Sequence, residues 1–157
     1  MTQKEIIKGR LGTSRWWLSE VLPRLSETLL AWAPAEGVRT VRGQLVEIIS
    51  VEAQLVPALT GEPLTDPALA EIDEETSSLE ALVAALGVVR ERTLACLDGL
   101  SEEELAAEVT VPQWYGAFWR TPMPCGEHFR NIAEHEFYHA GQLMTYLWVR
   151  GDNPYDW

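Results

Sequence analysis

The sequence predicts an all-α protein: an antiparallel four-helix bundle with a short strand or hairpin segment between the third and fourth helices. Four long segments repeat apolar residues at helical spacing, and proline and glycine clusters separate them. Between residues 109 and 121 the period changes to the alternation typical of a strand. Since the 157 residues contain no repeat and no low-complexity linker, we expect a single helical-bundle domain over residues 1–157.

The first two helices are predicted from their apolar periodicity and their end signals. The first covers residues 4–30, and Pro23 breaks or kinks it because proline removes a helix hydrogen bond. Thr40 is a capping residue for the second helix, which spans residues 41–59. The turn sequence at residues 60–63 ends it.

The third helix is predicted to begin near the acidic run at residues 71–75 and to close at Gly99. A second acidic run covers residues 102–104, and Ser101 with Glu104 has the spacing of a capping box, so a short helical turn should follow. We interpret both acidic runs as solvated helix starts, where negative side chains favour the positive end of the helix dipole.

The segment before the fourth helix has a different character. Residues 109–111 alternate like a short strand, and the aromatic stretch at residues 114–119 is expected to form a hairpin beside the bundle. Its aromatic rings could wall a pocket, although hydrophobic packing is their more usual role. The fourth helix follows two prolines and runs to about Val149, where Gly151 and Pro154 stop it.

Composition limits the classes of partner. The net charge of −12 argues against nucleic acid and against an anionic membrane surface, because both are bound by clustered Lys and Arg. No segment approaches the roughly 20 apolar residues of a spanning helix, and the first ten residues lack the apolar stretch of a signal peptide. The two cysteines form no disulfide framework. We therefore expect a cytoplasmic protein.

The histidines carry the clearest chemical signal. His135 and His139 lie four residues apart and so share one face of the fourth helix, and His128 lies on the same face seven residues earlier. Two imidazoles at this spacing can bind one metal ion. This face borders the apolar face, where a solvent-accessible site would form. The alternative is that the three histidines bind no metal and lie at the surface or at the core boundary, where they are hydrogen-bonded. Cys125 and His128 also have a metal-binding spacing, which we interpret as coincidence.

The segment 135–143, with the sequence HEFYHAGQL, resembles the fourth-helix motif of the DinB/YfiT-like superfamily of four-helix bundles. That motif has the form HExxH followed by Arg-Gly-Gln-Leu. The chain carries Ala140 where the superfamily often has Arg, a change that would affect substrate recognition or a surface contact. The superfamily usually supplies one further histidine ligand from the second helix, and Glu47 occupies that position here.

The resemblance implies a site of two histidines and one carboxylate, made by Glu47, His135 and His139. Glu52 is the rival third ligand, because it lies at the centre of the second helix's apolar face and would need a metal or an Arg as partner. Glu47 lies near the edge of that face, as the histidines lie near the edge of theirs. Both this geometry and the family match favour Glu47. A carboxylate in place of an imidazole favours harder ions.

The resemblance also implies a function. The superfamily contains thiol-dependent S-transferases and isomerases and metal hydrolases, so we expect a divalent-metal-dependent enzyme that uses zinc, nickel, iron or manganese. The ion would activate water or a low-molecular-weight thiol for hydrolysis or S-transfer on a small-molecule substrate. Homodimers are frequent in the superfamily, and the apolar first helix offers an interface. The alternative is a non-catalytic stress-response or ligand-binding bundle with a vestigial metal site.

Overall fold

The computed structural model describes residues 1–63, 65–112 and 122–157. Its helices are α1 (Gln3–Val21), α2 (Val41–Thr60), α3 (Pro67–Ala70), α4 (Leu79–Gly99), α5 (Glu102–Ala106) and α7 (Cys125–Val149), with 3₁₀ turns at Leu22–Arg24, Glu27–Leu29 and Pro154–Asp156. Strands β1 (Glu108–Val109) and β2 (Met123–Pro124) pair antiparallel between α5 and α7.

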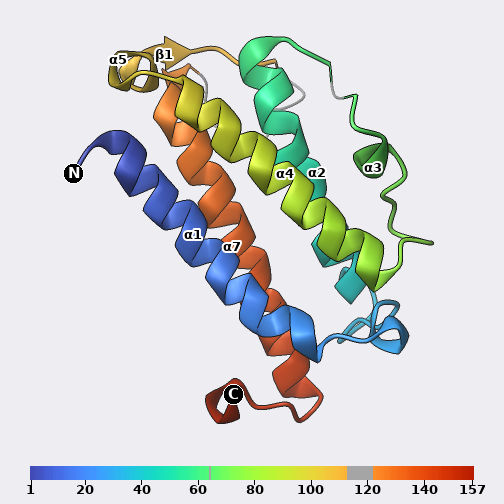
Figure 1. Cartoon of the computed structure of the whole chain (residues 1–157). Coiled ribbons are helices and arrows are strands. Elements are labelled where there is room, and N and C mark those ends of the chain that lie inside the picture. The colour runs from blue at the N-terminus through green and yellow to red at the C-terminus, as the bar shows by residue number, and fades with distance from the viewer. Residues whose placement is uncertain (64, 113–121) are drawn as a thin grey trace.

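The four long helices form a bundle of two parallel pairs (Figure 1). Helix α1 lies along α7, where Ser14 bonds Glu136, and α2 lies along α4, where Arg90 bonds Glu52. The two pairs run in opposite directions, because the connection over residues 22–40 reverses the chain between α1 and α2. The connection over residues 61–78 then returns the chain to the end at which α2 began, so α4 runs parallel to α2. The predicted all-α four-helix bundle with a short strand segment before its last helix is confirmed.

Several predicted helix boundaries are also confirmed by their caps. The Thr40 hydroxyl accepts the N–H of Gly43 at 3.0 Å, and α2 ends at Gly61, whose φ of 75° is the left-handed conformation that glycine adopts without strain. Ser101 and Glu104 make the reciprocal bonds of a capping box at the start of α5. Local sequence therefore determines where these helices begin and end.

Two predicted boundaries are wrong. The first helix ends at Val21 and not at residue 30. The predicted break at Pro23 is confirmed, because the chain tightens there into a 3₁₀ turn before an extended residue at Leu25. The acidic run at residues 71–75 does not start a helix. Asp73 accepts the backbone N–H groups of Glu75 and Thr76 in a turn, and α4 begins later, at Leu79.

The short strand predicted before the last helix is present, but it lies at different residues from those predicted. β1 covers residues 108–109, with Val109 opposite Met123, whereas the sequence placed the strand at residues 109–111. The hairpin expected at residues 114–119 lies outside the described residues. No described helix has the length and apolar character needed to cross a membrane.

The core of the bundle consists of two apolar clusters with a charged layer between them. The clusters are represented by Leu18, Ile49, Leu86 and Leu143 at one end and by Ile7, Leu55, Leu97 and Phe129 at the other. The charged residues are Arg15 of α1, Glu52 of α2, Arg90 of α4 and Glu136 of α7. Each long helix therefore contributes one charge to this layer.

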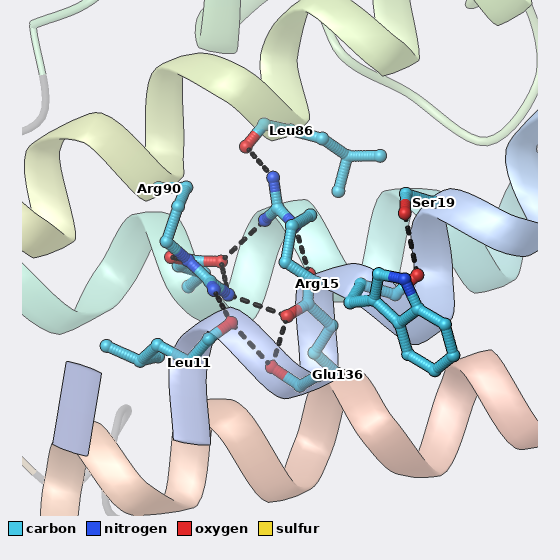
Figure 2. A network of polar contacts seen from close by, with 9 residues as sticks. Leu11, Arg15, Ser19, Leu86, Arg90 and Glu136 are labelled. Carbon is cyan, nitrogen blue, oxygen red and sulfur yellow. Dashed lines mark hydrogen bonds and ion pairs between the residues drawn. The ribbon is translucent and has the colours of Figure 1, made fainter. Parts of the chain in front are cut away.

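Hydrogen bonds connect the four charges of this layer into one network (Figure 2). Arg90 donates to Glu52 and to Glu136, each at 2.7 Å, and Arg15 donates to Glu136 at 2.5 Å. The two guanidinium groups also reach the backbone carbonyls of Leu11 and Leu86. Two positive and two negative charges balance, which is the condition for burying ionised groups at acceptable cost.

Candidate metal centre

Helices α2 and α7 bring together Glu47, His135 and His139. One potential ligand atom from each residue lies within 4.8 Å of the other two. The histidines are one turn apart on α7, and α2 passes beside that turn in the opposite direction. The structure thus places the three residues named from the sequence around one point.

The two imidazoles converge through the same ring atom. The Nε2 atoms of His135 and His139 are 3.1 Å apart. Two nitrogens held 2.0–2.1 Å from one tetrahedral ion would lie about 3.3 Å apart. Little rearrangement is therefore needed for both rings to bind the same ion.

A chain of hydrogen bonds fixes which nitrogen of His139 carries its proton. The Tyr146 hydroxyl donates to the Arg39 carbonyl at 2.9 Å, so its oxygen is left to accept the amide N–H of Gln44 at 3.0 Å. The Gln44 carbonyl oxygen then faces Nδ1 of His139, which must be the donor. Nε2 of His139 is left with a lone pair directed at the cluster, the arrangement that orients metal-binding histidines.

Burial keeps both imidazoles neutral. Desolvation, with a smaller contribution from His135, lowers the pKa of His139 to about 4. Desolvation also lowers the pKa of His135, against an opposing effect of Glu47. A metal ion at neutral pH would therefore not have to displace a proton from a charged imidazolium.

The low pKa of His139 predicts a pH effect on the stability of the metal-free protein. The unfolded chain takes up this proton near the ordinary histidine pKa of 6.5, whereas the folded chain takes it up only near 4. The free energy of unfolding should therefore fall as the pH drops from 6.5 to 4, by about 2–3 kcal/mol at most from this residue. Urea titrations across this range should give a shallower fall in His139→Gln. An equal fall in both proteins would contradict the assignment.

Glu47 is held by a neighbouring cation. Its Oε2 lies 2.8 Å from Nη1 of Arg39, which precedes α2, and both side chains are partly exposed. Beside the cluster opens a cavity of about 500 Å³, with Val38, Val51 and Tyr138 among its walls. The candidate ligands are thus accessible to a small molecule.

The other sequence candidates lie elsewhere. Glu52 is buried in the charged layer, where Arg90 and not a metal is its partner. His128 does not border the core as expected; it is fully buried within it. Cys125 is also buried, and desolvation raises the pKa of its thiol to about 11, so it is a protonated core residue. Neither residue belongs to the group of candidate ligands found among the described residues.

Sequence reasoning missed Arg39, Gln44 and Tyr146 as site residues. Gln44 is a buried polar residue three positions after Val41 and four before Ile48, within the apolar face of α2. That pattern could have identified it, because a buried amide needs partners. Ala140, the departure from the superfamily motif, is buried in the core and offers no polar group to the cavity.

Comparison with known proteins places this geometry in a family. None of the curated proteins compared with the chain matches it. The family model described as the DinB superfamily matches residues 11–143, which include the three candidate ligands and all four long helices in whole or in large part. The chain therefore belongs to the DinB superfamily.

Proposed function

We propose that the chain is a divalent-metal-dependent enzyme in which Glu47, His135 and His139 bind the ion. The observation that carries the proposal is the convergence of two neutral imidazoles and a carboxylate beside an open cavity. Three protein ligands of this kind are typical of catalytic metal sites, which keep a position for water or substrate. Two imidazoles with one carboxylate suit zinc, nickel, iron or manganese.

Each residue has a defined role in this proposal. A bound divalent ion lowers the pKa of a water or thiol ligand toward neutrality, which suits hydrolysis or S-transfer with a low-molecular-weight thiol. Gln44 holds the His139 ring with its Nε2 lone pair toward the cluster. Arg39 orients the Glu47 carboxylate. Tyr138, whose ring lies 5.2 Å from that of His139, covers one side of the cavity.

A second candidate is a non-catalytic ligand-binding or stress-response bundle with a vestigial site. Two contacts favour it. The Nε2 atoms of His135 and His139 are close enough to share a hydrogen bond, and Glu47 is paired with Arg39, so the polar groups of the cluster satisfy one another without an ion. The cavity would then bind its ligand through these side chains directly.

Metal binding separates the two candidates. We expect protein purified without a His tag and dialysed against Zn²⁺, Ni²⁺, Fe²⁺ or Mn²⁺ to bind one ion per chain, measured by elemental analysis and calorimetry. Replacing both histidines, His135→Ala with His139→Ala, should abolish that binding and the rise in Tm that accompanies it. His128→Gln is the matched control, because its ring lies outside the cluster and the replacement keeps most of its buried volume. Absence of stoichiometric metal, or binding that survives the double substitution, would favour the vestigial site.

The remaining expectations from the sequence stay predictions. They are a single domain over the whole chain, a cytoplasmic location, a homodimer and a small-molecule substrate without nucleic acid or membrane partners. Of these, only the substrate enters the metal-site proposal, through the cavity beside the cluster.

A further inference from the structure

The cavity beside the metal cluster contains one cationic group that the proposed ligand set does not use. Among the described residues that line the cavity, Arg39 is the only Lys or Arg, and the two histidines would bind a metal as neutral imidazoles. Val38, Val51 and Tyr138 add apolar surface around it. A cation set among apolar walls is a binding site for an anionic group attached to an apolar body.

The Arg39 guanidinium has N–H donors that its ion pair with Glu47 does not use. Its ion pair with Glu47 uses Nη1 alone, and its guanidinium makes no other polar contact with the part of the chain that the structure describes. By comparison, the buried Arg90 donates to Glu52, Glu136 and the Leu11 carbonyl together. A guanidinium carries five N–H groups, so Arg39 can hold Glu47 and still bind a second acceptor. Its side chain is 37% exposed, which leaves it accessible from the cavity.

The charge balance of the site also favours an anion. Glu47 contributes one negative charge, Arg39 cancels it, and imidazoles that bind a metal are neutral ligands. The full charge of a divalent ion would therefore remain uncompensated in the cavity. A site of three neutral histidines would leave the same net charge of +2 at the ion. Arg39 therefore offsets the negative charge that Glu47 adds in place of a histidine. A chain of net charge −12 thus contains a local site that attracts anions.

We propose that Arg39 binds the carboxylate of a small organic substrate whose reacting group lies at the metal cluster. The inference rests on the proposed metal-dependent function and specifies its substrate class: a small molecule with a carboxylate and a short apolar segment. Arginine suits this role because its planar fork matches both oxygens of a carboxylate. Val38, Val51 and Tyr138 would contact the apolar segment.

A pair of probe thiols that differ only in charge tests the proposal. Cobalt(II)-loaded protein is titrated with 3-mercaptopropionate and with its methyl ester, and binding is followed by the thiolate-to-cobalt absorption in the near ultraviolet. We expect Arg39→Gln to weaken the acid by about 10–100-fold and to change the ester by less than about twofold. Any direct carboxylate–cobalt contact is present in both proteins and cancels in this double comparison.

Arg42→Gln is the matched control. Arg42 lies three residues further along, binds the carbonyls of Glu75 and Ser77, and does not line the cavity. It should leave the affinities of both thiols unchanged. Equal weakening of acid and ester by Arg39→Gln would overturn the proposal, because the residue would then act only through Glu47.

A metal-free measurement keeps this inference separate from the metal proposal. Saturation-transfer NMR of the metal-free protein should detect propionate but not propionamide, and Arg39→Gln should abolish the propionate signal. If cobalt does not bind but this result is obtained, the metal proposal fails and the carboxylate site stands. If cobalt binds and neither measurement distinguishes acid from neutral analogue, the carboxylate site fails alone.

Discussion

Replacing Arg90 with methionine should lower the free energy of unfolding by about 3–5 kcal/mol, because it leaves buried carboxylates without their main partner. The Arg90 guanidinium bonds Glu52 and Glu136. Burial disfavours its charge, but those bonds and the two carboxylate charges outweigh burial and raise its pKa. After the substitution, Arg15 alone would face two buried negative charges. Urea denaturation followed by circular dichroism measures the loss.

Two further variants identify the cause of that loss. Arg10→Met removes an exposed cation 3.7 Å from Glu134, so it should cost less than about 1 kcal/mol. Adding Glu52→Leu to Arg90→Met leaves Arg15 and Glu136 as a balanced pair, and part of the lost stability should return. If the double variant is as unstable as the sum of the singles, lost packing and not unpaired charge explains the effect.

Replacement by glutamine should have opposite effects at the two carboxylates considered as third ligand. At Glu47 it should reduce metal affinity, and at Glu52 it should reduce the stability of the metal-free protein. Glu47→Gln should weaken metal binding on the order of 100-fold, because it removes a charged ligand and leaves Arg39 uncompensated beside the ion. Its effect on the stability of the metal-free protein should stay below about 1 kcal/mol, since it breaks a partly exposed ion pair.

Glu52→Gln should instead destabilise the metal-free protein by about 3 kcal/mol, because Arg15 and Arg90 would then share one buried carboxylate. Calorimetry with Zn²⁺ under conditions in which this variant is folded should give an affinity within a few-fold of wild type. A loss of metal affinity in Glu52→Gln as large as in Glu47→Gln would mean that the third ligand is misassigned.

Most of the fold could be predicted from local sequence because amphipathic periodicity and capping residues act over one or two turns. Thr40, Gly61 and Ser101 cap or end their helices as expected. The error beyond Val21 has a physical cause. Leu25, Leu29 and Leu30 are buried in the core although they are not part of α1. Their apolar spacing indicates that these residues are buried, but it does not indicate that they are helical. Only Pro23 indicates that the helix has ended.

The candidate site was less predictable because its polar contacts join distant segments. The spacing of the histidine pair suggested a metal site and the resemblance supported it, and Glu47 was favoured by its position at the edge of the helix face together with the resemblance. The bond from Gln44 to His139 spans 95 residues, and that from Tyr146 to Arg39 spans 107, so no local pattern encodes them. The charged layer could have been predicted more fully, because a charged residue within an apolar helix face indicates a buried ion pair. Glu52 was recognised within its apolar face, but Glu136, in the equivalent place between Ala133 and Ala140, was not.

The charged layer has a consequence for how the site can change over time. Glu52 is five residues from Glu47, and Glu136 adjoins His135, so the layer links α2 to α7 through Arg90 independently of the candidate ligands. Substitutions at the candidate ligands should therefore disturb the alignment of the two helices less than substitutions in the charged layer. A lineage could exchange histidine for glutamate at position 47, alter the metal or lose it, while the bundle kept its shape.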